Sequence, residues 1–388
     1  MSIITEEIQG PHPEPWAPLV TPSDRRHHLP SPRLELDVSI AVERFRRLSA
    51  VLPGARIRYA VKANPHPALL RALAAEGCGF DVASPAEAGA AMSARVPTDH
   101  LIHSNPVARR DHLRLCGALG VKRFVVDSLA ELEKLADAVP GAEVLIRIGT
   151  SGKGSDWPLS RKFGVPAPDA VPLLVAAVGL DLVPAGVAFH VGSQQRDPNA
   201  WTVPIAAAGE VFAALARYGF PLTVLDLGGG FPADHVGGVP ALGAYGRVID
   251  EALTATFGGR RPEILLEPGR GIVGDAGTLI SRVIGIVHRG GRRWVHLDAG
   301  VFTGLVETLD EAIRYRLETD RPGPLGPCVL AGPTCDSADV LYEKVPAQLP
   351  IDLAEGDEVR FLSAGAYTSC YSTVGFNGFE PLPTVLVR

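Results

Sequence analysis

Residues 56–64 read RIRYAVKAN, a short apolar and β-branched run that ends in a lysine and an asparagine. Seven further runs of this kind follow, and segments rich in Ala, Leu and Glu with helical leucine spacing separate them. Eight strands alternating with helices predict a (β/α)₈ TIM barrel. A doubly wound sheet is the rival, but no Gly-x-Gly-x-x-Gly turn follows the first run. The other seven runs are GFDVAS (79–84), HLIHSNP (100–106), RFVVDS (123–128), AEVLIRIG (142–149), GVAFHVGS (186–193), TVLDLGGG (223–230) and EILLEPG (263–269).

The sequence on either side of these runs has a different texture. Residues 1–30 are rich in Pro and His without a hydrophobic period, which predicts a mobile N-terminal arm. After residue 270, apolar runs such as RRWVHLDAG and DEVRFLSAGAYT are separated by Gly/Pro turns, which predicts a C-terminal all-β domain over 271–388. We therefore place the barrel at 38–270. Residues 31–37 either join the β-domain or precede the barrel.

Composition and charge exclude several classes of protein. The 388 residues carry a formal net charge of −6 without a basic block, which argues against a nucleic-acid partner. No apolar stretch of about 20 residues is present, so no membrane span is expected. The N-terminus lacks a signal pattern, and the five cysteines form no CxxC pair, which suits a reducing cytoplasm and predicts no metal site. These features indicate a cytoplasmic enzyme.

Polar residues stand at the ends of the expected strands, where barrels of this class carry their chemistry. Lys62 ends the first strand, where burial disfavours its charge and makes it a candidate Schiff-base nucleophile. A lysine that extends to the solvent at the rim is the alternative. The seventh and eighth strands end in Gly228–Gly230 and Glu267–Arg270, the loops that favour phosphate in this fold. Consecutive glycines let N–H groups approach an anion, and Arg270 adds a bidentate charge.

A lysine nucleophile and a phosphate cradle on one barrel face predict pyridoxal phosphate as the cofactor. Glu267 then partners the pyridine nitrogen and keeps it protonated, with a rim salt bridge to Arg270 as the alternative. His190 is expected to stack on the ring, although a satisfied core histidine fits the sequence equally well. Ser193 is expected to bind the phosphate. Asp81 and Arg147 are further polar residues at strand ends.

The chain resembles the fold-type III pyridoxal-phosphate decarboxylases, and within them the ornithine/lysine decarboxylases of the bacterial form. The resemblance extends from about residue 33 to the C-terminus, with its motifs in the order of the family. These motifs are YAVKANP (59–65), FDVAS (80–84), WPLSRKFG (157–164), FHVGSQ (189–194), LDLGGGFP (225–232), EPGR (267–270), GPTCDSADVL (332–341), GAYT (365–368) and FNGF (376–379).

The resemblance implies a role for each matching residue. Cys335 is implied to protonate the α-carbon and Asp336 to bind the distal amine of the substrate, both across the interface of a homodimer with shared active sites. Phe376 matches a wall of the site. A second acid for the distal amine falls at Asp310 or Glu311, of which Asp310 is preferred. The implied cofactor-binding residues are Lys62, Asp81, Arg147, His190, Ser193, Gly229, Gly230, Glu267, Gly269, Arg270 and Tyr367.

The implied reaction is the decarboxylation of L-ornithine to putrescine and CO₂, for polyamine synthesis or a specialised amine-building route. L-Lysine is the second candidate, since one methylene gives weak discrimination. meso-Diaminopimelate is the third, because its decarboxylases usually carry Glu at the position of Asp336. A non-catalytic, decarboxylase-like binding protein is the alternative of a different class. Such a protein would be expected to lose catalytic groups, but Lys62, Cys335 and Asp336 are all present.

Overall fold

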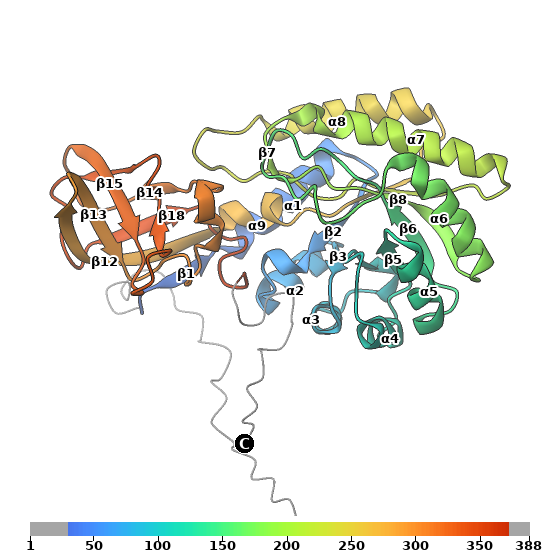
Figure 1. Ribbon diagram of the computed structural model, residues 1–388, viewed down its shortest axis with the longest axis horizontal. Helices are drawn as coiled ribbons and strands as arrows, with labels where there is room; N and C mark the ends of the chain where they lie inside the picture. Colours follow the sequence, from blue (N-terminus) through green and yellow to red (C-terminus); the bar gives the residue numbers. More distant parts are fainter. Residues whose placement is uncertain (1–29, 372–388) are drawn as a thin grey trace, which may run out of the picture. The chain divides into compact units, whose positions relative to one another are not determined.

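The computed structural model describes residues 30–371 and contains a closed barrel of parallel strands in the order β10-β11-β2-β3-β4-β5-β6-β8 (Figure 1). Each strand lies within one of the eight runs, apart from the start of β8, so the predicted TIM barrel is confirmed. The predicted arm (1–30) and Phe376 lie outside the described residues, apart from Pro30. The barrel strands are β2 (Arg56–Ala60), β3 (Gly79–Val82), β4 (Leu101–His103), β5 (Arg123–Val126), β6 (Glu143–Arg147), β8 (Val183–Ala188), β10 (Val224–Asp226) and β11 (Glu263–Leu266).

Helices follow the strands and cover the outside of the barrel. Serines that follow two strands begin the next helices, because Ser84 and Ser128 each accept a backbone N–H three residues later. The helices are α1 (Val38–Val51), α2 (Pro67–Ala75), α3 (Pro85–Ser93), α4 (Arg110–Ala118), α5 (Leu129–Ala138), α6 (Ala167–Gly179), α7 (Thr202–Arg217), α8 (Leu242–Phe257) and α9 (Arg270–Val273). Short 3₁₀ turns are η2 (Val61–Ala63), η3 (Thr98–His100), η4 (Pro198–Trp201), η5 (Gly274–Ala276) and η6 (Val306–Glu311).

The two faces of the barrel strands belong to two hydrophobic clusters. Ile102, Val125, Leu145 and Leu265 belong to a small cluster contributed by alternate strand positions. Their strand neighbours, such as Phe124, belong to the large cluster shared with the helices. Apolar side chains from alternate strand positions therefore fill the barrel interior. Polar groups of the site are expected at the ends of the strands instead. At that end, β7 (Ser155–Trp157) and β9 (Ser193–Gln195) form a separate antiparallel pair.

A second sheet follows the barrel and has its own hydrophobic core. The strand β1 (Arg33–Leu36) pairs antiparallel with the first strand of this sheet, from Arg33 opposite Ile280 to Leu36 opposite Gly277. Residues 33–36 therefore belong to the β-domain although they precede the barrel. The remaining strands of the β-domain are β12 (Gly277–Arg289), β13 (Arg292–Leu297), β14 (Arg316–Glu318), β15 (Leu325–Ala331), β16 (Val340–Leu341), β17 (Ala347–Pro350) and β18 (Glu358–Leu362).

The chain returns from the β-domain to the barrel after β18. The backbone N–H of Tyr367 donates to the carbonyl of Ala63 at 2.9 Å, and the side-chain amide of Asn64 donates to the carbonyl of Gly365 at 3.0 Å. Residues 365–370 are thereby held against η2, the turn that carries Lys62. Within residues 30–371, no helix is long and apolar enough to cross a membrane.

Candidate active site

Lys62 lies in η2, directly after β2. Its ammonium group forms an ion pair with Oδ2 of Asp81, near the C-terminal end of β3. Burial lowers the pKa of Lys62, but the charges of Asp81, Tyr367 and Glu267 outweigh it and raise the pKa above its ordinary value. Burial thus disfavours the charge of Lys62, as expected, but the neighbouring charges reverse the net shift. Oδ1 of Asp81 meets no hydrogen-bond partner in the described structure.

Arg270 and Ser193 lie together beside the glycine loop after β10. The Nε and one terminal nitrogen of Arg270 donate to the Ser193 hydroxyl, each at 3.3 Å. The same nitrogen donates to Oε1 of buried Glu307 at 2.5 Å. The other terminal nitrogen, Nη1, is buried and finds no acceptor among residues 30–371. A guanidinium with one unused donor edge is suited to an anion.

The glycines of the loop are required by close approaches of the backbone. A Cβ on Gly229 would lie 2.5 Å from the carbonyl oxygen of Glu267 and 3.3 Å from Nε2 of His190. Gly230 has a φ of +102°, and its Cβ would lie 2.6 Å from the carbonyl oxygen of Gly192. Glycine at these positions therefore lets the loop pack directly against the backbone at Gly192 and Glu267.

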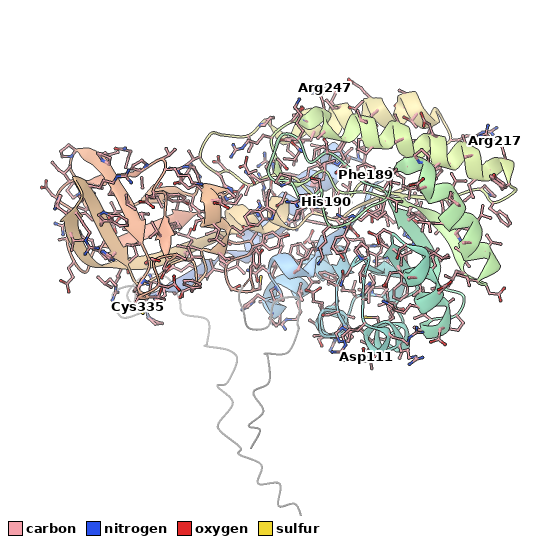
Figure 2. The ribbon with its side chains drawn as sticks, viewed as in Figure 1. Asp111, Phe189, His190, Arg217, Arg247 and Cys335 are labelled. Carbon is pink, nitrogen blue, oxygen red and sulfur yellow. The ribbon has the colours of Figure 1, made fainter. Side chains whose placement is uncertain are left out.

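His190 follows β8 (Figure 2), and its Nδ1 accepts the backbone N–H of Gly192 at 3.0 Å. Burial, followed by the charges of Arg147 and Lys62, lowers the pKa of His190 to about 3. The imidazole is therefore neutral near pH 7, with its proton on Nε2. A neutral, fixed ring at the end of a barrel strand is suited to stack on a planar ligand.

Three acidic residues and one hydroxyl meet where β3, β4, β10 and β11 end. The hydroxyl of Ser104 donates to Oε1 of Glu267. Burial raises the pKa of Glu267 well above its ordinary value, and the charges of Asp226 and Asp81 raise it further, whereas Lys62 and Ser104 lower it. Burial also raises the pKa of Asp226 to about 6. Glu267 is therefore poised to exchange a proton with a basic ligand atom.

Arg147, Gly269 and Tyr367 complete the barrel side of the site. Arg147 ends β6, where burial lowers its pKa and the charges of Glu267, Asp127, Asp81 and Asp226 oppose that shift. The guanidinium carbon of Arg270 lies 5.0 Å from the centre of the Tyr367 ring. Tyr367 has a φ of 59°, a conformation that few non-glycine residues adopt and that is held by its bond to Ala63. A Cβ on Gly269 would lie 3.2 Å from the Tyr367 hydroxyl.

Cys335 and Asp336 lie on an exposed turn between β15 and β16. Asp339 holds this turn, because its carboxylate accepts backbone N–H groups from Val301 at 2.7 Å and Thr334 at 3.1 Å. Within the described residues, no hydrogen bond or ion pair joins Cys335 or Asp336 to the barrel side chains. Figure 2 shows Cys335 on the β-domain and His190 beside the barrel. One chain thus does not bring these two groups of predicted site residues together.

Asp310 and Glu311, the two candidates for the second distal-amine acid, are used differently by the fold. Glu311 pairs with Arg314 and accepts the backbone N–H groups of Lys344 and Val345. The side chain of Asp310 is 96% exposed and contacts only Lys344, at 3.5 Å, among its described ion pairs. Glu311 is therefore committed to its own chain, whereas Asp310 is available to a ligand.

Three residues of this region were not predicted. Ser104 directly follows β4 within the run HLIHSNP, and Asp226 ends β10 within the run TVLDLGGG, so a polar residue at a strand end is the available signal. Glu307 lies three residues before Asp310, but nothing in the sequence indicates its pairing with Arg270, which lies 37 residues away.

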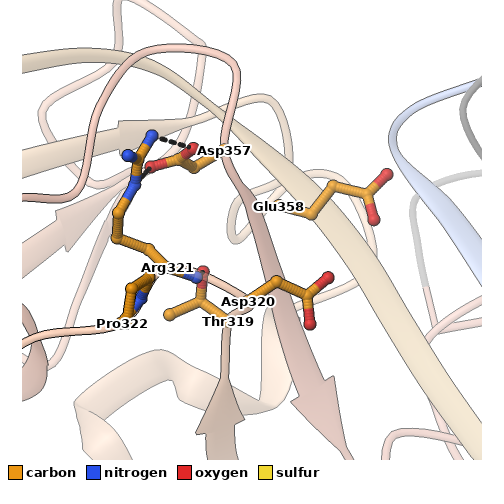
Figure 3. Close-up of a pocket in the computed structure, with 6 residues that line it drawn as sticks. All are labelled: Thr319, Asp320, Arg321, Pro322, Asp357 and Glu358. Atoms are coloured by element: carbon orange, nitrogen blue, oxygen red, sulfur yellow. Dashed lines mark hydrogen bonds and ion pairs between the residues drawn. The ribbon is translucent and has the colours of Figure 1, made fainter.

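Two other kinds of site, a metal centre and a surface hollow, were considered within the described residues. No group of three or more His, Cys, Asp or Glu side chains within residues 30–371 could hold a metal ion. A hollow of about 190 Å³ on the β-domain contains the Arg321–Asp357 ion pair at 2.7 Å (Figure 3). Its charges are those of a solvated surface, and it contains none of the predicted site residues. It is lined by Thr319, Asp320, Arg321, Pro322, Asp357 and Glu358.

Comparison with known proteins places this geometry in a family. The family described as pyridoxal-dependent decarboxylase, pyridoxal binding domain, matches residues 39–274, more than half of the chain. A lysine/ornithine decarboxylase of Selenomonas ruminantium is 35% identical over 361 residues, which cover 92% of this chain and 90% of that protein.

Solved structures agree with this match. The lysine/ornithine decarboxylase of Vibrio vulnificus, solved with putrescine, is 35% identical with a TM-score of 0.80 and covers 94% of this chain and 96% of its own. The arginine decarboxylase of Paramecium bursaria Chlorella virus is 28% identical with a TM-score of 0.83, over 91% of this chain and 95% of its own.

The residues present fit pyridoxal phosphate. The unused Nη1 of Arg270 suits its phosphate, and so do the consecutive glycines Gly229 and Gly230, which carry no side chain. Lys62 suits its aldehyde, and Glu267 offers a carboxylate to its ring nitrogen. The chain therefore belongs to the ornithine/lysine family of fold-type III pyridoxal-phosphate-dependent decarboxylases and is an amino-acid carboxy-lyase that uses pyridoxal phosphate.

Proposed function

We propose that the enzyme decarboxylates L-ornithine to putrescine and CO₂. L-Lysine is the second candidate for the substrate, and meso-diaminopimelate is the third. The carboxylate of Asp336, exposed beside Cys335, is the observation that carries this proposal. A distal ammonium group that leaves water needs such a partner. The exposed carboxylate of Asp310 supplies a second one. The names of the relatives, which include lysine/ornithine and arginine decarboxylases, support a basic amino acid as the substrate class.

The barrel residues have complementary roles in this proposal. When bound, pyridoxal phosphate supplies an aldehyde that captures the amino group and a ring that accepts the electrons of the broken bond. Lys62 holds and releases the aldehyde carbon. Glu267 keeps a proton at the ring nitrogen, and His190 covers one face of the ring. The phosphate is held by Gly229, Gly230, Ser193, Arg270 and Tyr367, and Asp81, Arg147 and Gly269 line the remainder.

The β-domain residues act on the substrate. Cys335 donates a proton to the α-carbon after CO₂ has left, and Asp336 and Asp310 hold the distal amine, with Phe376 as a wall. Cys335 and Asp336 are exposed and make no described contact with the barrel site of their own chain, which supports their use across a homodimer interface. The five cysteines are all unpaired, including the exposed Cys335, which supports a reducing cytoplasm as the location.

The substrate is tested by product analysis with L-ornithine, L-lysine, meso-diaminopimelate and L-norvaline, the analogue of ornithine without its amine. Ornithine should give the highest kcat/KM. Asp336→Ala should lower kcat/KM for ornithine by about 30-fold or more, because the ammonium would be buried unpaired, and should barely change the rate with norvaline. Ser337→Ala, on the same exposed turn, is the control. Equal losses for both substrates would make Asp336 structural and remove the support for a diamine product.

The shared site is tested by mixing two inactive variants, Lys62→Ala and Cys335→Ala. Heterodimers regain one intact site, so up to a quarter of the wild-type activity should return when subunits exchange freely. Mass spectrometry under native conditions would establish that exchange has occurred. Exchange without recovered activity would mean that each site is built within one chain.

A further inference from the structure

We propose that Ser104 is a positioning residue for Glu267, whose carboxylate it keeps ionised by holding one oxygen while the other remains free for the ring nitrogen of pyridoxal phosphate. This inference rests on the role proposed for Glu267. The hydroxyl of Ser104 donates to Oε1 of Glu267, across 163 residues of sequence. A second side-chain partner of Glu267 is Asp226, which ends β10.

The backbone fixes both partners of this hydrogen bond. The N–H of Ser104 donates to the carbonyl of Val82 at 3.3 Å, which extends the pairing of β4 with β3 beyond His103. The N–H of Glu267 donates to the carbonyl of Gly228 at 2.8 Å, which extends the pairing of β11 with β10. Both side chains therefore project from rigid strand ends, where a contact is maintained with little loss of conformational entropy.

Ser104 competes with a second partner for Glu267. One oxygen of Asp226 accepts the N–H of Gly228 at 2.8 Å, while Oδ2 meets no donor among residues 30–371. That oxygen can hydrogen-bond to Glu267 only when one of the two carboxyls is protonated. A protonated Glu267 would then donate to Asp226. A hydroxyl that donates to Glu267 favours the ionised carboxylate instead.

The charges around Glu267 act on its carboxyl in both directions. Asp226 and Asp81 favour a protonated Glu267, and Lys62 opposes them. Arg147 also faces Glu267 from β6. Burial and the two carboxylates outweigh the opposing groups and raise the pKa of Glu267 well above its ordinary value, so the Ser104 hydroxyl is needed to favour the ionised carboxylate. With Ser104 present, the proton belongs on the ring nitrogen. Without it, the proton moves to Glu267 and the ring loses part of its power to accept electrons.

The test uses holoenzyme loaded with pyridoxal phosphate that carries nitrogen-15 in the ring. In wild type, the resonance should have the position of a protonated ring nitrogen. Ser104→Ala should move it toward that of a neutral pyridine and add an infrared C=O band of a protonated carboxyl. The value of kcat should fall about tenfold with KM unchanged, as expected for one hydrogen bond to a charged group. Ser104→Thr retains the hydroxyl and should restore both signals.

Two controls separate the possible causes. Ser128→Ala removes the hydroxyl that caps α5 after the neighbouring strand β5, and it should lower stability without moving the nitrogen resonance. Glu267→Gln should move the resonance at least as far as Ser104→Ala. If Glu267→Gln leaves the ring protonated, the role of Glu267 fails and the inference fails with it. If Glu267→Gln moves the resonance but Ser104→Ala does not, the inference alone is overturned.

Discussion

The two ends of the barrel both carry acids and bases, but the charges are arranged differently. Where the strands begin, Arg123 pairs with Glu143 at 2.8 Å and with Glu263 at 3.3 Å, and Arg56 pairs with Glu263 at 3.1 Å. Where the strands finish, Asp81 and Asp226 each keep one oxygen that no donor of the described structure reaches. The first end satisfies its own charges, whereas the second is incomplete without a ligand.

This difference shows which end does chemistry without reference to a motif. An unsatisfied buried polar atom costs free energy, so it persists where a ligand supplies the missing partner. Raised pKa values gather at the same end. Burial and like charges raise those of Glu267 and Asp226, whereas opposite charges raise that of Lys62 against the effect of burial. Changes at the two ends should therefore have separable effects, on turnover at one end and on stability at the other.

The largest effect is expected for Lys62→Ala, which removes the group that holds the aldehyde. The rate should fall by roughly 10³-fold or more, because this step has no substitute nucleophile in the site. In wild type, borohydride reduction and peptide mapping should place the pyridoxyl label on Lys62. A label on Lys153 or Lys162 would contradict the assignment.

Glu267→Gln should have the next largest effect. A neutral amide cannot keep the ring nitrogen protonated, so kcat should fall on the order of a hundredfold if one such charge contact supplies about 3 kcal/mol. The cofactor should stay bound, since its phosphate contacts and Lys62 are unchanged, and its visible absorbance measures the bound fraction. An unchanged kcat would make Glu267 part of the rim and would remove the contrast between the ends.

The barrel could be predicted because its signal is local. Buried β-branched runs that end in polar residues specify both the strands and the end at which the site lies. Pairing over long distances could not be predicted in the same way. The alternating run RLEL (33–36) is typical of a half-buried strand, but nothing in it indicates β12 as its partner.

The candidate site shows the same limit. Lys62 as the candidate Schiff-base lysine, and the glycine loop with Arg270 as the candidate phosphate site, could be predicted from the residue types at strand ends. The raised pKa of Lys62 does not, because it depends on Asp81 in the next strand. Ser104 could not be distinguished from Ser84 and Ser128, which also follow barrel strands and only cap helices. The role proposed for Cys335 requires a second chain, and a local sequence pattern carries no information about such a partner.

A smaller effect is expected for acid stability at the functional end. His103 ends β4, is buried, and neither of its ring nitrogens has a partner within residues 30–371. Burial lowers its pKa to about 4, against 6.5 for an ordinary histidine. The folded chain thus binds this proton less tightly than the unfolded chain. The free energy of unfolding should therefore fall as pH drops from about 6.5 toward 4.

His103→Phe would test this contribution, because a phenyl ring keeps the packing against Phe124, whose ring centre lies 5.5 Å away. Urea unfolding at pH 5 should show the variant gaining about 2 kcal/mol relative to wild type, compared with the same pair at pH 8. The kcat should change little, because the His103 ring packs against Phe124, a member of the cluster shared with the helices. A gain that is equal at both pH values would mean that the ring packs better but does not titrate.

The smallest effect is expected where the strands begin, for Arg123→Met. This change retains the packing of the stem and removes two ion pairs, which are partly exposed, with Glu143 39% and Glu263 27% accessible. Pairs of this kind contribute about 0–1 kcal/mol each. Arg123 also lowers the pKa of buried Arg58, so its removal relieves a repulsion that offsets part of the loss. The free energy of unfolding should therefore decrease by about 1 kcal/mol or less, and added salt should reduce the difference further.

Urea unfolding at two salt concentrations measures this loss of stability. The effect on turnover is measured as kcat/KM with ornithine, which should stay within twofold of wild type. If kcat/KM falls more than twofold while the stability changes only as expected, the two ends are coupled through the barrel core. The division between a stabilising end and a reactive end would then be wrong.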